Sequence, residues 1–373
     1  MTTRTNVPST MEAVRLHGVD DFRVEEIPTP SPGLREVLCR VEAVTICGTD
    51  IAIIKGHHQQ WAKDLPLTLG HEWAGRVVAL GEGSEGFGFH VGDPVCGTSH
   101  SGCGFCRMCL IGRYNLCVNY GHPELGHRQY GHVTDGAYAE YMVNTLKTIH
   151  KIPEDMPFEI AANVDPAAIG LHSVKRTGIH PGETVVVLGP GPVGFFAFQC
   201  AFALGAGRVI MVGSGERLAK AAELGAETIN YRETDPVQAV RDMTDGWGAD
   251  VVVDCAATKD SLVQAIDMTC KGGRVAYTGI PTEAPVLNYR KLILEEVDVY
   301  GVRANPNAAV ETIPLFQRGA IRAEPLITHR FPLKEYREAY DTFVERRDGA
   351  ILVSLRPGAE GSGETAGTAQ PKG

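Results

Sequence analysis

The sequence predicts an α/β protein that combines a β-rich domain with a doubly wound domain built on a parallel sheet. Three observations carry this prediction. Short alternating runs broken by Gly and Pro fill residues 11–160, β-rich runs alternate with helical patterns from about 183 to 301, and a segment of helices and one strand follows residue 305. The length of 373 residues suits two or three domains.

The order of the runs sets the expected domain boundaries. Strands are predicted at MEAVRLH, EVLCRVEAV, GRVVALG and GAYAEYMV. Beyond residue 183, TVVVLG, RVIMVG, DVVVDC and GRVAYTG alternate with the helical patterns VGFFAFQCAFALG, ERLAKAAELG and SLVQAIDMTC, which is typical of βαβ units. The helices IPLFQRGAI and LKEYREAYDTFVERR and the strand AILVSLR follow. We expect a β-rich domain at 1–160, a doubly wound domain at 161–304, a return to the first domain at 305–356 and a disordered tail at 357–373.

Composition excludes several classes of function. The formal net charge of −10 argues against binding to nucleic acid or to an anionic membrane. No apolar run approaches the roughly 18 residues of a membrane span, and the first residues lack the apolar core of a secretory signal. We therefore expect a cytoplasmic protein whose ten cysteines bind metal or take part in catalysis rather than form disulfides.

Four of these cysteines form a dense cluster in the sequence. Cys103, Cys106, Cys109 and Cys117 follow the spacing C-x2-C-x2-C-x7-C within a lobe at about 96–120. Four thiolates suit the tetrahedral preference of Zn²⁺, and such a closed site is structural. An iron–sulfur cluster uses a similar ligand set, and chance buried thiols are the remaining alternative.

A second candidate metal set lies nearer the N-terminus. ICGTD contains Cys47, and LGHEWAG contains His71 and Glu72. A thiolate, an imidazole and a carboxylate are the mixed ligands of a catalytic zinc, which keeps one position open for water or substrate. Each residue alone is more often structural, so the prediction depends on their occurrence together with the four-cysteine cluster.

The stretch TVVVLGPGPVGFFAFQ carries G-x-G-x-x-G between a predicted strand and a predicted helix. Gly189 permits a tight turn, Gly191 lets the backbone approach a pyrophosphate, and Gly194 allows close packing of helix on strand. With Pro192 and Val193, these residues are predicted to hold the pyrophosphate of a dinucleotide at a helix N-terminus.

The residues that follow the second predicted strand bear on the choice of coenzyme. The acidic residue that usually binds the ribose 2′-hydroxyl is absent, since Gly213 occupies its position. Ser214 and Arg217 are suited to a 2′-phosphate, although Glu216 lies between them. The prediction is therefore NAD or NADP, with a lean to NADP.

Together, Cys47, His71-Glu72, the four-cysteine lobe and the glycine-rich turn resemble the zinc-dependent medium-chain alcohol dehydrogenases. The resemblance covers about residues 11–356, and CGTD, GHE, VDPAAIGLHSV and GVRAN look like the polyol (sorbitol) and threonine dehydrogenase branch. It implies a GroES-like catalytic domain with an inserted Rossmann domain, two zinc ions per chain, one catalytic and one structural, and a homodimer or homotetramer.

The resemblance also implies roles for single residues. Cys47, His71 and Glu72 match catalytic zinc ligands, and Asp165 occupies the place of a further residue that approaches the metal. Thr49 matches the hydroxyl that takes the substrate proton. The cofactor would lie near Thr278, Gly279, Ile280 and Arg303. Many relatives carry a histidine in the proton relay where this chain has Ala52, so the proton must leave by another path.

The expected activity is oxidation of a secondary alcohol to a ketone by hydride transfer to NAD(P)⁺. The polar segment 57–61 suggests a hydroxylated substrate: a polyol, sugar, diol or hydroxy-amino acid. Two alternatives stay open at this point. One is a reductase of the same superfamily that acts without a catalytic metal on activated double bonds or quinones, and the other is a non-enzymatic zinc or redox sensor.

Overall fold

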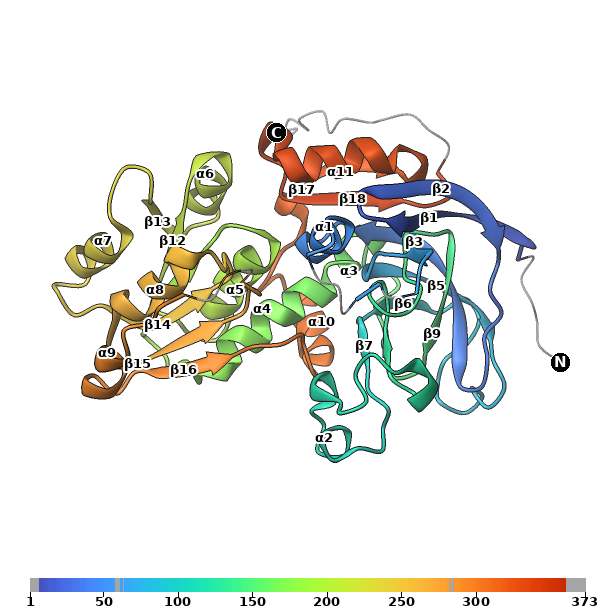
Figure 1. Ribbon diagram of the computed structural model, residues 1–373, viewed down its shortest axis with the longest axis horizontal. Helices are drawn as coiled ribbons and strands as arrows, with labels where there is room; N and C mark the ends of the chain where they lie inside the picture. Colours follow the sequence, from blue (N-terminus) through green and yellow to red (C-terminus); the bar gives the residue numbers. More distant parts are fainter. Residues whose placement is uncertain (1–6, 58–60, 63, 282, 284, 360–373) are drawn as a thin grey trace. The chain divides into compact units, whose positions relative to one another are not determined.

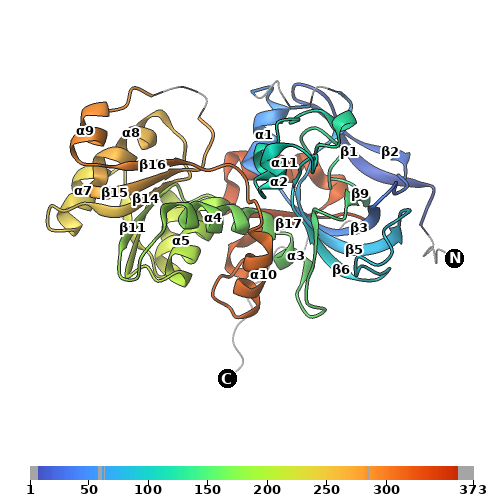
Figure 2. The same cartoon turned by 90° about the horizontal axis from the view of Figure 1, so that it is seen from below.

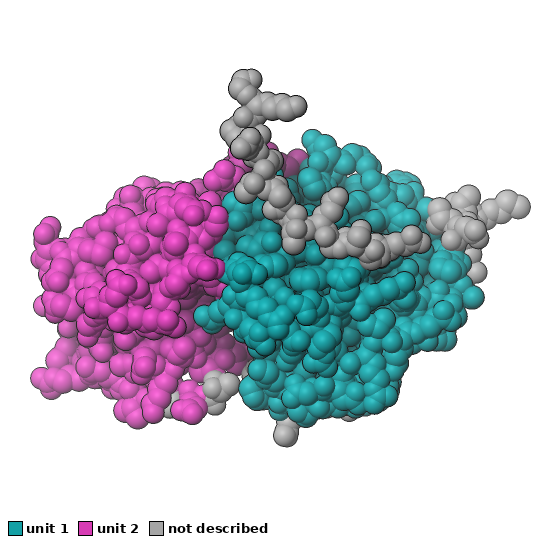
Figure 3. All heavy atoms as spheres, turned by 90° about the horizontal axis from the view of Figure 1, so that it is seen from above, with its two compact units in different colours: residues 1–165, 323–373 teal, residues 166–322 magenta. Residues whose placement is uncertain are grey.

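The structure, a computed structural model, describes residues 7–57, 61–62, 64–281, 283 and 285–359. The chain divides into two compact units, coloured separately in Figure 3. The first comprises residues 1–165 and 323–373, and the second comprises residues 166–322. The second unit thus extends beyond residue 304, where the sequence places its end. Most of the expected tail, from residue 360, lies outside the described residues.

The first unit is rich in strands, as the sequence predicts. Its strands are β1 (Thr10–Gly18), β2 (Asp21–Pro28), β3 (Glu36–Thr45), β4 (Leu67–Thr68), β5 (Glu72–Leu80), β6 (Pro94–Gly97), β7 (His100–Ser101), β8 (Arg128–Gln129), β9 (Tyr141–Thr145), β10 (Ile149–Lys151), β17 (Ile327–Pro332) and β18 (Leu352–Arg356). Its helices are α1 (Gly48–Ile54), α2 (Arg107–Leu110), α3 (Phe158–Ala161) and α11 (Tyr336–Glu345), with 3₁₀ turns η1 (Tyr114–Leu116), η2 (Pro123–Leu125), η3 (Glu324–Leu326), η4 (Leu333–Glu335) and η5 (Arg347–Gly349).

The main sheet of this unit joins the two separate chain segments. Its order is β10-β6-β5-β3-β18-β17, and β9 also pairs with β3. In β3, Val37, Cys39 and Val41 are buried in alternation with more exposed residues and contribute to the core of the unit. This period-2 pattern is the one that predicts a strand with one buried face. Figure 1 shows the red C-terminal strands beside the blue N-terminal ones.

The second unit is the predicted doubly wound domain. Its strands are β11 (Thr184–Leu188), β12 (Arg208–Gly213), β13 (Glu227–Asn230), β14 (Ala249–Asp254), β15 (Thr269–Tyr277) and β16 (Asp298–Gly301). Its helices are α5 (Pro192–Ala203), α6 (Gly215–Glu223), α7 (Pro236–Met243), α8 (Lys259–Met268), α9 (Tyr289–Leu294) and α10 (Ala309–Gln317), and α4 (Val164–Thr177) enters it from the first unit.

All neighbouring strands of the second unit pair in parallel, in the order β13-β12-β11-β14-β15-β16. Helices cover both faces, with α4 and α5 on one face and α8 and α9 on the other (Figure 2). The strand order reverses between β11 and β14, where α/β sheets bind ligands beyond the carboxyl ends of their strands. The predicted doubly wound fold is therefore confirmed.

Within the described part of the chain, every helix is too short or too polar to cross a membrane.

Candidate metal and dinucleotide sites

Strand pairing brings the first predicted metal set together. Thr45 at the end of β3 pairs with Glu72 at the start of β5, so Cys47 emerges next to His71 and Glu72. One ligand atom from each of these three residues lies within 4.8 Å of the others. His71 and Glu72 are only 4% and 1% exposed. The structure thus assembles a buried thiolate–imidazole–carboxylate group from residues that are far apart in the sequence.

Asp50 shapes the turn that carries Cys47. Cys47 is the N-cap of α1 with extended dihedrals, and Asp50 is the third residue of the helix. Asp50 accepts a hydrogen bond on Oδ2 from the backbone N–H of Cys47 at 3.0 Å, which is the back-bonding half of a capping box. Its other oxygen, Oδ1, lies 3.3 Å from Nδ1 of His71. One carboxylate therefore supports both the cysteine and the histidine.

The electrostatics of this group favour a bound cation. Burial, with the charges of Asp165 and Asp50, raises the pKa of Glu72 to about 8. Burial and the charge of Glu72 raise the pKa of Cys47 to about 11. Oε2 of Glu72 has no hydrogen-bond partner among the described residues. A divalent cation would stabilise both ionised groups, and the donor set of one S, one N and one O suits zinc.

His71 and Asp50 stabilise each other. Burial lowers the pKa of His71, but the charges of Asp50 and Cys47 outweigh burial and hold this pKa well above its usual range. Burial raises the pKa of Asp50, but the charge and hydrogen bond of His71 and the hydrogen bond of Tyr138 hold it below its usual value. Asp50 is therefore an ionised acceptor that directs Nδ1 of His71 towards itself and leaves Nε2 for a metal.

Two further predicted residues lie beside this group. Asp165 is 1% exposed, and its Oδ1 accepts a hydrogen bond from the backbone N–H of Ser99 at 3.2 Å. It acts electrostatically on Glu72 but is not one of the three residues whose ligand atoms come together. Thr49 is the second residue of α1 and is partly exposed.

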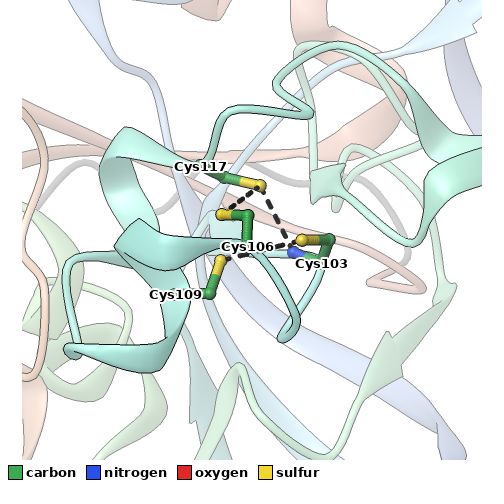
Figure 4. Close-up of side chains that lie close together, drawn as sticks. All are labelled: Cys103, Cys106, Cys109 and Cys117. Atoms are coloured by element: carbon green, nitrogen blue, oxygen red, sulfur yellow. Dashed lines mark hydrogen bonds between the residues drawn. The ribbon is translucent and has the colours of Figure 1, made fainter.

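The four-cysteine cluster forms a second group in a separate lobe of the first unit. The four Sγ atoms lie within 4.8 Å of one another (Figure 4). The Sγ atoms of Cys103 and Cys109 are 4.0 Å apart, and those of Cys106 and Cys117 are 3.9 Å apart. Tetrahedral Zn–S bonds of about 2.3 Å place sulfurs about 3.8 Å apart, whereas a disulfide requires about 2.05 Å. The spacing fits one tetrahedral ion.

Backbone N–H groups prepare two of these thiols for a metal. Hydrogen bonds from the backbone of Val118 and Cys109 lower the pKa of Cys106 to about 6. The backbone of Phe105 likewise lowers the pKa of Cys103. Burial raises the pKa of Cys109 to about 12, so this thiol needs a cation to ionise near neutral pH.

In the second unit, the glycine-rich turn has the geometry that its sequence predicts. Gly189 has a φ of +93°, and a Cβ there would lie 2.9 Å from Cβ of Ala256. A Cβ on Gly194 would meet the carbonyl oxygen of Gly189 at 2.0 Å, so helix and turn pack too closely for a side chain. A Cβ on Gly191 would meet nothing within 4 Å. Open space therefore remains at the N-terminus of α5, which starts with Pro192 and Val193.

The end of β12 explains why the usual acidic residue is missing. A Cβ on Gly213 would lie 2.5 Å from Cγ of Pro190, so a carboxylate side chain does not fit there. Ser214 is the N-cap of α6, and its hydroxyl bonds to that of Tyr231 at 3.2 Å. Arg217 is partly exposed in the first turn of α6.

The remaining predicted cofactor residues lie at the ends of β15 and β16. The backbone N–H of Thr278 donates to the carbonyl oxygen of Asp254 at 3.0 Å, and its hydroxyl donates to Ser173 at 2.8 Å. Gly279 follows, and Ile280 is 57% exposed. Arg303 is exposed just after β16. These residues lie at the carboxyl edge of the sheet, on the side where the glycine-rich turn lies.

Two residues that the sequence analysis did not single out belong to the first site. Asp50 carries a readable signal, since an acidic residue three positions after an N-cap is typical of a capping box. Tyr138 donates its hydroxyl to Oδ2 of Asp50 at 2.6 Å. It carries no such signal, because its partner lies 88 residues away in the sequence.

Comparison with known proteins identifies the family. Residues 33–154 match the alcohol dehydrogenase GroES-like domain, and residues 192–318 match the zinc-binding dehydrogenase family. A sorbitol dehydrogenase of Halalkalibacterium halodurans is 37% identical, with 91% of this chain and 97% of the relative covered. An erythritol/L-threitol dehydrogenase of Mycolicibacterium smegmatis is 33% identical, with 94% and 99% covered.

A solved structure agrees over the whole fold. A zinc-binding dehydrogenase from Sinorhizobium meliloti, bound to NADP, is 31% identical with a TM-score of 0.86 and covers 94% of this chain and 100% of that one. The chain belongs to the zinc-dependent medium-chain alcohol dehydrogenases, and it uses zinc and a nicotinamide cofactor on CH–OH donors. Within this family it falls in the polyol and threonine dehydrogenase branch. The alternatives of a metal-free reductase and a sensor are not favoured.

Proposed function

We propose that this chain oxidises one secondary hydroxyl of a polyol to a ketone, with a catalytic zinc held by Cys47, His71 and Glu72. The observation that carries the proposal is the convergence of these three ligand atoms within 4.8 Å in a buried part of the first unit. Zinc at this site would act as a Lewis acid that lowers the pKa of a substrate hydroxyl. Three protein ligands leave a fourth position for that hydroxyl.

The chain's own residues would hold the substrate hydroxyl and remove its proton. Thr49 is two residues from Cys47 at the partly exposed start of α1, where its hydroxyl can accept the proton. Ala52 supplies no acceptor on the next turn of this helix. We therefore propose that the proton passes from Thr49 to water. Asp165 would remain an outer carboxylate that tunes Glu72, since it is bonded to the backbone of Ser99.

We propose that a second zinc, bound by Cys103, Cys106, Cys109 and Cys117, is structural. Two features support this role: four thiolates leave no open position, and the Sγ separations of 3.9 and 4.0 Å suit one tetrahedral ion. In an iron–sulfur cluster with several irons, the thiolates bind different metal atoms and lie farther apart.

For the coenzyme we propose NADP, held at Gly189, Gly191 and Gly194. The exclusion of a side chain at Gly213 removes the carboxylate that would repel a 2′-phosphate. Ser214 and Arg217 are the candidate phosphate ligands, and Arg217 offers a planar, permanently charged donor. The bound NADP of the Sinorhizobium meliloti relative supports the same choice.

A polyol is proposed as substrate because the sorbitol and the erythritol/L-threitol dehydrogenases match almost the whole chain. Of the polar segment that suggests a hydroxylated substrate, residues 58–60 lie outside the described residues. Trp61 is buried, and its indole N–H donates to the hydroxyl of Tyr120 at 2.5 Å. It therefore belongs to the wall of the unit rather than to an exposed polar loop.

We also propose a homo-oligomer that forms along β16, the edge strand of the parallel sheet. An edge strand offers unpaired backbone groups to another chain. Next to this edge, α9 exposes Tyr289, Ile293 and Leu294, which are 71%, 72% and 64% accessible. An apolar group of this kind is typical of an interface between protein subunits. A cytoplasmic location is part of the same proposal, since all ten cysteines are free thiols in the described chain.

The test is reduction of the nicotinamide, followed by absorbance, with a panel of polyols, sugars, diols and threonine. Each substrate is run with NAD⁺ and NADP⁺, before and after treatment with a chelator. We expect turnover with a polyol, a preference for NADP⁺ and loss of the rate on chelation. A rate that survives complete removal of the metal would overturn the proposed role of zinc, and turnover with threonine alone would overturn the polyol assignment.

A further inference from the structure

Tyr138 holds the carboxylate that supports the metal-ligand set. Its hydroxyl donates to Oδ2 of Asp50 at 2.6 Å, a short hydrogen bond to an ionised acceptor. Both side chains are fully buried, at 0% exposure. The same Oδ2 accepts the N–H of Cys47, and Oδ1 faces Nδ1 of His71. Tyr138 therefore contacts the one residue that touches two of the three proposed ligands.

The backbone of Tyr138 is fixed on both sides. Its N–H donates to the carbonyl oxygen of Leu69 at 2.9 Å, and its carbonyl oxygen accepts the N–H of Val14 at 2.8 Å. Leu69 lies two residues before His71, so Tyr138 is tied to the strand segment that presents the histidine. The phenol can move little relative to Asp50 or His71.

Gly70 makes room for the ring of Tyr138. A Cβ at Gly70 would lie 2.6 Å from Cδ1 of Tyr138, and Gly70 has a φ of +86°. On another side the ring packs against Tyr336, with centroids 4.9 Å apart. The absence of a side chain immediately before the GHE histidine therefore has a local cause, the phenol that reaches past it to Asp50.

We propose that Tyr138 is a positioning residue for the metal: it fixes Asp50, Asp50 fixes the orientation of His71, and Nε2 of His71 stays aimed at the ion. An outer partner of a ligating histidine typically contributes roughly 10–100-fold to metal affinity. This inference rests on the proposed zinc at Cys47, His71 and Glu72. The remaining possibility is that Tyr138 only fills the core, in which case its hydroxyl has no influence on the metal.

The experiment compares zinc release in Tyr138→Phe and in a matched control, Tyr130→Phe. Tyr130 is also buried, at 4% exposure, and its hydroxyl accepts the backbone N–H of Thr145 at 2.8 Å, away from Asp50. The holoenzyme is mixed with a coloured chelator, and the two phases of zinc release are assigned by the loss of one of them in Cys47→Ser. The Co²⁺-substituted proteins are compared by their visible spectra.

We expect Tyr138→Phe to release the Cys47-bound zinc about 10-fold faster than wild type and to shift the Co²⁺ spectrum. Tyr130→Phe should release it at the wild-type rate, even if its melting temperature falls equally. Equal release from Tyr138→Phe and wild type, or equal acceleration by both variants, would overturn the inference. A wild-type protein without a Cys47-dependent zinc would instead contradict the proposed function.

A double-mutant cycle with Asp50→Asn tests the route through the carboxylate. If Tyr138 acts through Asp50, Tyr138→Phe should accelerate release in the wild-type background but add little in the Asp50→Asn background. Full additivity of the two effects would show that Tyr138 acts independently of Asp50. Asp50→Asn alone also tests the network if Tyr138→Phe does not fold, since release at the wild-type rate would remove the link on which the inference depends.

Discussion

At the scale of single residues, the first metal site concentrates negative charge in a place that disfavours it. Glu72, Asp50 and Asp165 are each no more than 1% exposed, and the Cys47 thiol lies beside them. Buried anions are costly unless they are paired or bind a cation. Metal binding and the ionisation of Cys47 and Glu72 are therefore linked.

Replacement of the thiolate tests this linkage directly. Cys47→Ser should remove one zinc per chain and lower kcat/KM by more than the roughly 10–100-fold expected for an outer partner. Cys270→Ser is the control, because Cys270 lies on β15 in the other unit. Zinc content by atomic absorption and steady-state rates check both variants. Retention of two zincs and of turnover in Cys47→Ser would contradict the site.

The carboxyl of Glu72 makes the stability of the metal-free protein depend on pH. Its pKa in the folded chain is about 8, against an ordinary value of 4.5. Between these values the unfolded chain loses this proton while the folded chain keeps it, so the free energy of unfolding should fall as pH rises from about 4.5 to 8. Glu72→Gln stays neutral and should flatten this decline.

Urea unfolding of chelator-treated protein at several pH values measures the effect. Glu124→Gln is the control, because Glu124 is exposed and lies in η2, outside the site. An unchanged pH dependence in Glu72→Gln would contradict the raised pKa. Zinc should restore stability most strongly at high pH, where its ligands ionise most readily.

At the scale of elements, the four-cysteine lobe has little core of its own. Phe105, Leu110 and Ile111 are 86%, 72% and 67% exposed, although α2 lies among them. A segment that buries so little apolar surface needs another source of stability, and a metal supplies it.

Cys106→Ser should therefore release one zinc and increase amide hydrogen exchange across residues 102–118. Each kcal/mol lost should lower the melting temperature by about 2–4 °C if the first unit unfolds as a whole. Cys39→Ser, in the core of β3, makes the same substitution outside the lobe and should keep both zincs. Unchanged exchange in the lobe of Cys106→Ser would show that the metal does not hold it.

The elements themselves follow closely from the sequence pattern. TVVVLG and RVIMVG are apolar throughout, and both became buried strands of the parallel sheet. The position of the domain end is harder to read, since α10 follows the last strand of the second unit without a break in composition. Spacing also brings out the ligand motifs, because each lies within one turn. Spacing does not reveal the contact between Asp50 and Tyr138, which depends on how separate segments pack.

At the scale of the whole molecule, assembly should depend on the apolar surface of α9. Ile293→Asp places a charge on this surface and should shift the protein towards monomers, because an interface core does not tolerate an unpaired charge. Val19→Asp, at a 67% exposed position between β1 and β2, is the control. Analytical ultracentrifugation measures both. A wild-type protein that is itself monomeric would contradict the proposed oligomer.

The main sheet of the first unit has a consequence for synthesis of the chain. Thr45 pairs with Ser354, so β3 waits for a strand near the far end of the sequence, while all the strands of the second unit lie between residues 184 and 301. Domains complete on the ribosome can fold as they emerge. The cofactor-binding unit should therefore fold first, and a ribosome that stops before residue 352 should leave a chain with a finished Rossmann unit and an open edge at β3.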